Sequence, residues 1–148
     1  MAVKVEGLRE LERALQELPK TTARNTLRRV LRKAAEPVQS TMEAIAPRDT
    51  GWTAESIEIS STLNAAQRRE AKREGTYFAE VHIGMRRGSA AIFQEFGTID
   101  QPARPFMRPA WDATQDIALR TIETQLGGEI EKSAQRLARK AARLAAKG

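Results

Sequence analysis

Residues 21–45 read TTARNTLRRVLRKAAEPVQSTMEAI, and this stretch decides the fold class. Apolar side chains return every three or four residues, at Leu27, Val30, Leu31, Ala34, Ala35, Val38, Met42 and Ile45. This spacing is typical of one buried helix face, and it continues for about five turns. The stretch therefore predicts a long helix that Thr21 or Thr22 caps and that Pro37 kinks.

Further helical patterns lie on both sides of this stretch. Near the start, leucines recur at helical spacing at Leu8, Leu11, Leu15 and Leu18. They predict a short first helix that Pro19 ends. Residues 90–96 favour another short helix, and Pro109 is well placed as the first residue of a third. We expect Gly127–Gly128 to end that helix and the alanine-rich residues 129–146 to form the last one.

Strand patterns lie between the helical ones. Alternating apolar residues predict strands over residues 2–6, 56–62 and 76–83. Residues 63–75 are rich in charge and poor in apolar residues, which indicates a solvated loop with at most a helical turn. Helices followed by strands and then helices indicate the α+β class. We expect a small antiparallel sheet of three or four strands, packed with a long N-terminal helix and C-terminal helices.

Length and composition suit a globular protein. The chain has 148 residues, of which 30% are charged and 41% are hydrophobic. We expect a single α+β domain over residues 1–127, followed by a basic, alanine-rich helix or extension over residues 128–148. No stretch approaches the roughly 20 apolar residues of a membrane span. The sequence therefore predicts no membrane partner.

The sequence offers no constellation typical of catalysis. There is no cysteine, and the single histidine, His82, is expected to be a half-exposed residue of the sheet. A zinc site would need further nitrogen or sulfur ligands, and none is available near it. No glycine-rich phosphate loop or nucleophile motif is present. We therefore expect a protein that is not an enzyme and has no catalytic, cofactor or metal site.

Residues 93–111 have the most unusual local composition in the chain. Three prolines, one glycine and four large aromatic residues lie within these nineteen residues. Because proline fixes its own φ and disfavours helix in the residue before it, most of this segment is expected to be a stiff, non-helical strap. Its candidate interface residues are Glu95, Phe96, Arg104, Phe106, Arg108 and Trp111.

Two questions about the strap stay open at the level of sequence. The aromatic residues could anchor a neighbouring subunit, since aromatic and Arg side chains dominate interface energies, or they could complete the core of their own subunit. Glu95 could be a general acid with a raised pKa. Alternatively it could bond to the backbone of the Gly97-Thr98 turn, or pair with Arg104 or Arg108. The second interpretation is favoured, because a lone carboxylate is a weak catalytic signal.

Basic residues form a stripe on the long predicted helix. The net charge of the chain is +6 and the pI is about 10.2. Candidate DNA-facing residues, away from the apolar face, are Arg24, Arg28, Arg29, Arg32 and Lys33. Such a stripe can follow phosphates, but it can equally be a solvated face or a contact to acidic residues of a subunit.

Four ordered blocks of this sequence resemble one known family. The first is Gly7-Leu8 with its spaced leucines, and the second combines Pro47, Thr50 and Gly51 with Ser56-Ile57. The third and fourth blocks are Glu-Phe-Gly-Thr at residues 95–98 and Ala-Arg-Pro-Phe-Met-Arg-Pro-Ala at residues 103–110. In order and spacing they resemble the tail-completion or head–tail joining proteins, the neck proteins of long-tailed bacteriophages and prophages.

The resemblance implies a structural role in the virion. Such a protein would form a ring, expected to be a homo-hexamer, at the head-proximal end of the tail. It would contact the tail terminator and the connector or stopper proteins of the head, and DNA would pass through its lumen with weak, non-specific contact. It would be assembled in the cytoplasm of the bacterial host. The alternative class is a basic nucleic-acid-binding protein of a bacterium or mobile element.

Overall fold

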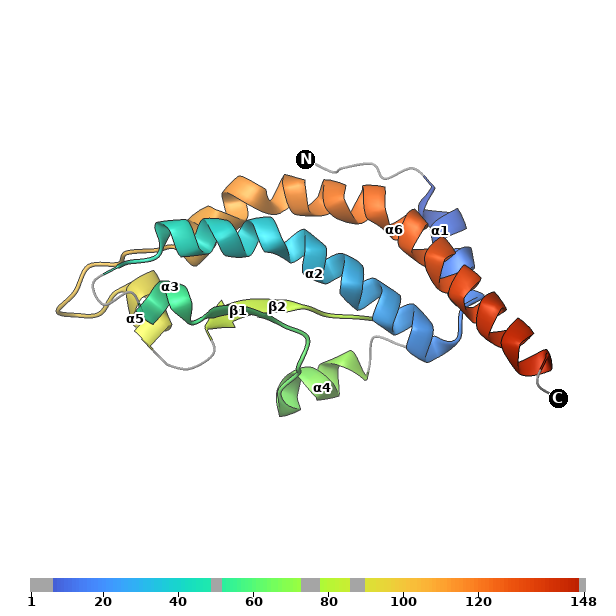
Figure 1. The fold of residues 1–148 in the computed structure, drawn as a ribbon. Coiled ribbons are helices and arrows are strands. Elements are labelled where there is room, and N and C mark those ends of the chain that lie inside the picture. Colours follow the sequence, from blue (N-terminus) through green and yellow to red (C-terminus); the bar gives the residue numbers. More distant parts are fainter. Residues whose placement is uncertain (1–6, 49–51, 73–77, 86–89, 147–148) are drawn as a thin grey trace. The chain divides into compact units, whose positions relative to one another are not determined.

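The computed structural model describes residues 7–48, 52–72, 78–85 and 90–146 (Figure 1). In chain order the elements are α1 (Leu8–Gln16), α2 (Lys20–Ile45), α3 (Trp52–Glu55), β1 (Ile57–Ser60), α4 (Ala65–Ala71), β2 (His82–Met85), α5 (Ala90–Phe96) and α6 (Met107–Ala145). They group into two compact units. Unit 1 comprises Met1–Val30, Leu63–Glu80 and Thr121–Gly148, and unit 2 comprises Leu31–Thr62 and Val81–Arg120.

The long predicted helix is confirmed as α2. Its predicted apolar face is largely buried, with Val30 and Val38 almost completely so. Pro37 lies inside the helix, where it removes one backbone donor. One turn later, the hydroxyl of Thr41 donates a hydrogen bond to the Pro37 carbonyl at 2.9 Å. The apolar face therefore maintains the helix across a residue that would otherwise interrupt it.

Unit 1 has a core made by α1, the start of α2 and the second half of α6. The buried residues of this core are Leu15, Leu18, Ala23 and Ile130, with Leu11, Ala14, Leu27, Leu126 and Leu137 packed against them. The predicted short first helix is therefore confirmed, and its leucine face is the surface that it buries.

The predicted helix end at Gly127–Gly128 is wrong, because α6 continues through both glycines to Ala145. A glycine inside a helix costs about 1 kcal/mol relative to alanine. Here the partly buried Leu126 and the buried Ile130, one on either side, hold the helix against the core of unit 1. Tertiary packing thus overrides a local helix-breaking signal. The predicted domain boundary at residue 127 remains a prediction.

Unit 2 contains the sheet, which is antiparallel as expected. Ile57 pairs with Met85 and Ser60 pairs with His82, and these are the ends of the register. A hydrogen bond ties the sheet to α2, because the Gln39 side chain donates to the Ile57 carbonyl at 3.1 Å. His82 is half-buried, as predicted for a residue of this sheet.

The expected number of strands is wrong, since the described residues form a sheet of two strands, not three or four. The strand predicted over residues 76–83 instead begins at His82 and continues to Met85. Alternation identifies a pleated segment, but pairing depends on the partner, and β1 offers only four residues. The predicted strand over residues 2–6 lies outside the described residues.

The stretch predicted to be a loop over residues 63–75 contains α4. Asn64 and Gln67 form a reciprocal capping box, in which each side chain accepts a hydrogen bond from the backbone N–H of the other residue, at 2.9 and 2.8 Å. No residue of α4 is buried. The solvated character of this stretch is therefore confirmed, while the helix is longer than a single turn.

Candidate assembly interface

Glu95 connects α5 to the first turn of α6. Its carboxylate is buried and accepts three backbone N–H groups, from Phe106 at 2.8 Å, Met107 at 2.9 Å and Arg108 at 3.0 Å. The first N–H groups of a helix have no partner within that helix and favour negative charge beside them. Glu95 therefore caps α6 from a separate helix.

The charge state of Glu95 follows from the same contacts. Burial raises the pKa of the carboxyl. The hydrogen bonds from Met107, Phe106 and Arg108, together with the Arg108 charge, lower the pKa by more than burial raises it. The net pKa lies below its usual value, so the group is a carboxylate at neutral pH. A general acid needs the opposite shift. Glu95 is thus a structural anion, and its partners are the α6 N–H groups rather than the Gly97-Thr98 turn.

The non-helical part of the strap is tied to α5 by its backbone. Gly97 has a φ of +75°, a conformation that favours glycine, and an added Cβ would lie 2.8 Å from the Ala103 nitrogen. The Thr98 N–H donates to the Gln101 carbonyl at 2.8 Å, and the Arg104 N–H donates to the Gln94 carbonyl at 2.7 Å. These bonds fix where the strap leaves α5 and where it returns.

The aromatic residues of the strap divide between core and surface. Phe106 is completely buried and fills the core of unit 2, which is the alternative that the sequence left open for it. In contrast, Phe96 is 65% exposed and Trp111 is 49% exposed. Arg104 and Arg108 are also exposed, and the Arg108 guanidinium lies over the Phe96 ring, 5.6 Å from its centroid. Two aromatic and two Arg side chains are therefore exposed at the surface of unit 2.

Three of these side chains, Phe96, Arg108 and Trp111, border an apolar groove of about 510 Å³ in unit 2. Of the predicted interface residues, Glu95, Phe96, Arg108 and Trp111 line it. Other lining residues include Met42, Ile83, Ala91, Ile92 and Met107. Apart from Glu95, His82 and Arg108 the lining is apolar, a composition that fits a protein-binding surface.

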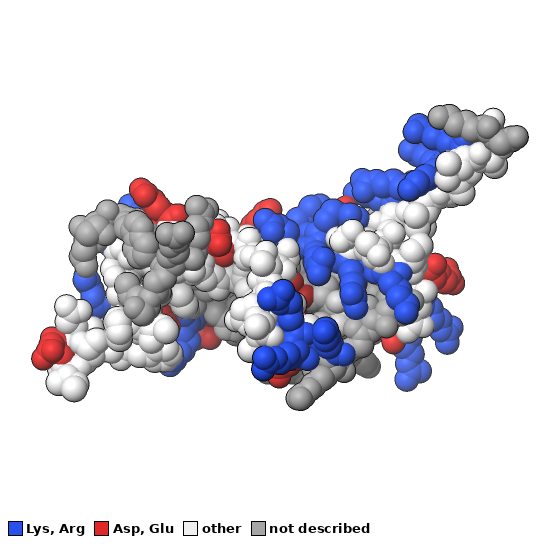
Figure 2. Space-filling view, turned by 90° about the horizontal axis from the view of Figure 1, so that it is seen from below, with Lys and Arg blue, Asp and Glu red and all other residues white. Residues whose placement is uncertain are grey.

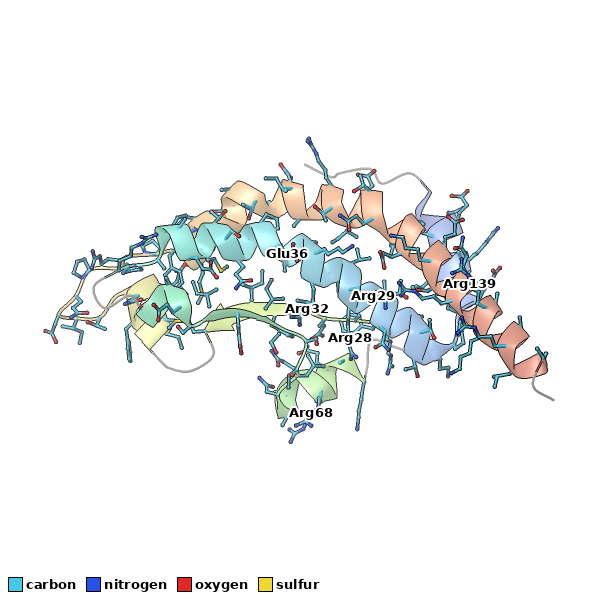
Figure 3. The ribbon with its side chains drawn as sticks, viewed as in Figure 1. Arg28, Arg29, Arg32, Glu36, Arg68 and Arg139 are labelled. Carbon is cyan, nitrogen blue, oxygen red and sulfur yellow. The ribbon has the colours of Figure 1, made fainter. Side chains whose placement is uncertain are left out.

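The basic residues of α2 do not all face solvent (Figure 3). Arg24, Arg32 and Lys33 are exposed, whereas Arg28 and Arg29 are half-buried. The Arg28 Nε atom is buried and has no hydrogen-bond partner in the described part of the chain. The predicted stripe thus exists on the helix, but two of its five members are committed in part to the interior of unit 1.

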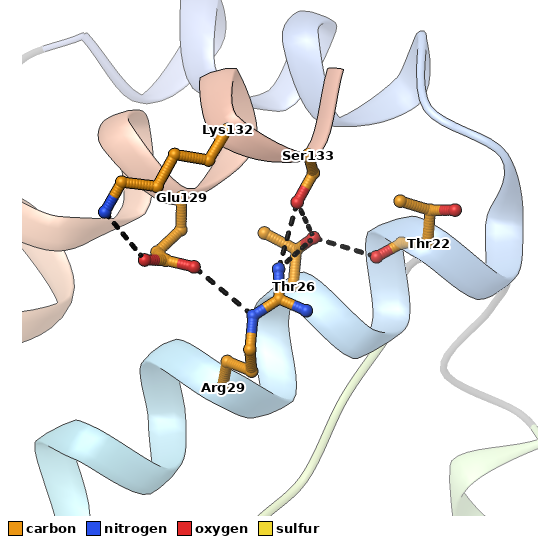
Figure 4. A network of polar contacts seen from close by, with 6 residues as sticks. All are labelled: Thr22, Thr26, Arg29, Glu129, Lys132 and Ser133. Atoms are coloured by element: carbon orange, nitrogen blue, oxygen red, sulfur yellow. Dashed lines mark hydrogen bonds and ion pairs between the residues drawn. The ribbon is translucent and has the colours of Figure 1, made fainter. Parts of the chain in front are cut away.

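Arg29 belongs to a polar network between α2 and α6 in unit 1 (Figure 4). Its Nε donates to Glu129 at 3.2 Å, and its Nη2 donates to Ser133 at 3.0 Å. Glu129 also pairs with Lys132 at 3.3 Å, and the hydroxyls of Thr26 and Ser133 are 2.8 Å apart. The Glu129 carboxylate is almost buried between two cations, so Arg29 is a structural residue of unit 1.

Charge is divided unequally between the two units. Unit 1 carries 17 Lys and Arg residues against 10 Asp and Glu, which gives +7. Unit 2 carries 8 against 9, which gives −1. The basic character of the chain therefore belongs to unit 1, and Figure 2 shows one face on which Lys and Arg side chains gather.

The described residues contain no group of three His, Cys, Asp or Glu side chains that could hold a metal ion. Across the same residues, no helix has the length and hydropathy needed to cross a membrane.

The sequence interpretation missed two sets of side chains. Ile92 and Phe93 on α5 are both more than half exposed, and Ile92 lines the groove. Their position near Phe96 in a short helix was visible, but the sequence does not indicate which side faces the core. The network of Glu129 and Ser133 was also missed, because it joins residues about 100 positions apart.

The sequence matches, over residues 9–97, the protein family described as "Bacteriophage HK97-gp10, putative tail-component". The match covers more than half of the chain and ends at Gly97, within the strap. No curated protein and no solved structure gives a significant match.

Proposed function

The chain belongs to the HK97-gp10-like family of phage tail components, and from this premise we propose that it completes the head-proximal end of a tail as a ring. The ring would be built of identical subunits, expected to be six. It would join the tail terminator to the connector or stopper proteins of the head. Its role would be structural, and its place in the virion would be the neck, after assembly in the cytoplasm of the host.

The exposed aromatic surface of unit 2 carries this proposal. Phe96 and Trp111 are large apolar side chains left in water beside an apolar groove. Contiguous exposed apolar surface of this kind marks interaction sites on soluble proteins. Arg108, which is stacked on Phe96, belongs to the residue type most enriched with aromatics at interface hot spots.

The backbone around these residues supports the same function. Glu95 fixes the start of α6, and the bond between Arg104 and Gln94 fixes the end of the strap. Side chains on a pre-organised backbone lose less conformational entropy when they bind. A joint that must form reproducibly in every subunit of a ring benefits from this rigidity.

Ring formation sets a further requirement on the surface. Identical subunits close a ring through two different patches that fit each other head to tail. We propose that the groove surface of unit 2 is one of these patches. DNA would pass through the lumen, where Arg24, Arg32 and Lys33, which are exposed on α2, would make weak contact with it.

The test uses a phage or prophage whose copy of this gene is deleted and supplied from a plasmid. Phe96→Ala combined with Trp111→Ala should lower the titre at least tenfold and leave heads and tails unjoined in electron micrographs. Ile117→Ala is the matched control, since it is 52% exposed on α6 but does not line the groove. Its titre should equal that of the wild type. A normal titre for the double variant would refute the proposed interface.

A second candidate function is supported by the charge of unit 1. A free nucleic-acid-binding protein would use that charge directly, and it would bind DNA tightly as a monomer or dimer. It does not account for the exposed aromatic surface on unit 2. If the deletion leaves tailed, infectious particles at normal titre, this second function replaces the first.

A further inference from the structure

The C-terminal part of α6 is a helix without a packing partner. Packing of α6 in unit 1 reaches Leu137, and every residue from Ala138 to Ala146 is exposed. Short helices are marginal in water, so most helical stability in proteins comes from burying one face. An exposed helical end of this length is therefore a candidate for binding something outside the subunit.

The charge of this segment is of one sign. From residue 132 to the end of the sequence there is no Asp or Glu, and Lys132, Arg136, Arg139, Lys140, Arg143 and Lys147 are basic. Lys132 pairs with Glu129. The next four basic side chains, at positions 136, 139, 140 and 143, have no ion pair among the described residues. They are available to an anionic partner in a way that Arg29 is not.

The spacing of the four residues places them on one stripe. With 3.6 residues per turn, Arg136, Arg139, Lys140 and Arg143 lie within an arc of about 100°. Between the first and the last of them the helix rises about 10 Å. Along the axis of duplex DNA that length corresponds to roughly three phosphates of one strand. A helix that carries basic side chains along such a stripe can follow a phosphate backbone.

We propose that the stripe Arg136, Arg139, Lys140 and Arg143 is a binding site for the phosphate backbone of duplex DNA. This inference rests on the proposed function, in which DNA passes through the ring, and it shifts the main DNA contact from α2 to the end of α6. The contact is electrostatic and independent of base sequence, because no aromatic residue lies between residues 132 and 146 to stack on bases.

Two other occupants fit the stripe less well. A membrane-surface helix combines its basic face with large apolar side chains such as Trp, Phe and Leu. This segment offers one exposed leucine, Leu144, among alanines. An acidic surface on a second copy of the chain is also disfavoured, since unit 2, the less basic unit, carries only −1.

The experiment measures binding of the full-length protein to a fluorescein-labelled duplex of random sequence by anisotropy, over a series of NaCl concentrations. The triple variant Arg136→Gln, Arg139→Gln, Arg143→Gln removes three charges and keeps good helix formers. Each lost phosphate contact reduces the slope of log K against log salt by about 0.9, so the slope should become about 2.7 units less steep. Circular dichroism should show unchanged helix content.

The matched control removes three exposed charges from α4 and the residue that follows it, which are also in unit 1: Arg68→Gln, Arg69→Gln and Lys72→Gln. Its slope should stay within one unit of the wild type. The proposal is overturned if the α6 variant keeps the slope of the wild type, or if both variants lose the same amount. Equal affinity of the wild type for vesicles rich in phosphatidylserine, or for polyglutamate, also overturns it, since DNA would not then be the preferred partner.

Failure of this inference and failure of the proposed function give different results. The groove variant Phe96→Ala with Trp111→Ala reports on joining of heads and tails, and its binding to DNA should be unchanged. The α6 triple variant reports on DNA binding in purified protein, where no tail is needed. If the α6 triple variant shows the reduced salt slope while the groove variant gives normal titres, the DNA site is supported and the proposed neck ring is refuted.

Discussion

Replacing Glu95 by Gln tests whether one buried carboxylate organises the strap and the start of α6. One carboxylate oxygen accepts two N–H groups and the other accepts the third. Glutamine has a similar shape but only one acceptor oxygen, and an NH₂ group takes the place of the other. That NH₂ group would face either the Arg108 N–H or the N–H groups of Phe106 and Met107, and it can accept a hydrogen bond from none of them. At least one buried donor is left without a partner, and the charge beside the α6 N-terminus is lost.

The magnitude follows from these two losses. A buried donor left unsatisfied costs about 1–3 kcal/mol. Removal of the negative charge beside a helix N-terminus costs about 0.3–1 kcal/mol, or up to ~2 kcal/mol when the site is partly buried. The free energy of unfolding should therefore fall by roughly 2–4 kcal/mol, as measured by urea denaturation followed through circular dichroism and tryptophan fluorescence. Glu36→Gln, which alters an exposed glutamate on α2, should change it by less than ~0.5 kcal/mol.

The same substitution should change the response to acid. The pKa of Glu95 is lowered in the folded chain, so its contribution to stability is present above the pKa of the unfolded chain and is lost as pH falls through the folded value. In the wild type, stability should decline in acid below the ordinary glutamate range, and Glu95→Gln should decline less steeply there. A variant with the stability and the acid profile of the wild type would refute the capping role of Glu95.

Three further experiments test other parts of the molecule. Gly97→Ala places a Cβ 2.8 Å from a backbone nitrogen at a positive φ, and it should destabilise by about 1–3 kcal/mol in urea titrations, whereas Gly84→Ala meets no atom within 4 Å and should cost far less. Gly127→Ala makes only an ordinary contact at 3.5 Å inside α6, so it should raise the melting temperature, with a gain of about 0.5–1 kcal/mol; a loss would contradict the continuous helix. A double-mutant cycle on Arg29 and Glu129, measured by thermal unfolding, should give a coupling of about 1 kcal/mol, since the Arg29 side chain is 40% exposed; zero coupling would remove Arg29 from the core network.

Much of the secondary structure could be predicted because it depends on local spacing. The apolar face of α2 and the leucines of α1 are periodic signals that survive in the folded chain. The errors have a common physical origin. The end placed at Gly127–Gly128 and the strand placed at residues 76–83 are local signals that distant partners override. In the first case the partner is the core of unit 1, and in the second it is the four-residue strand β1.

The candidate site could be predicted in its residue types but not in its contacts. The sequence singled out Glu95 and favoured a structural role bound to backbone, yet the N–H groups that it accepts lie eleven to thirteen residues further along. It also treated Phe106 and Trp111 as equivalent anchors. Only the fold separates them, because Phe106, just before α6, is completely buried, whereas Trp111, within α6, is about half exposed.

The division of charge between the two units also depends on the fold and could not be predicted from local sequence. Along the sequence, basic residues occur in two helices at opposite ends of the chain, and nothing local joins them. The fold assigns both the start of α2 and the end of α6 to unit 1, so that one unit holds +7 and the other −1. A ring that conducts DNA would need surfaces for its neighbours and a different surface for phosphates. Unit 2 has exposed aromatic residues and almost no net charge, whereas unit 1 has the charge and, among its described residues, no large exposed aromatic side chain. Separate parts of one chain would therefore meet these needs, which is why variants in the groove and in the stripe of α6 should fail in separable ways.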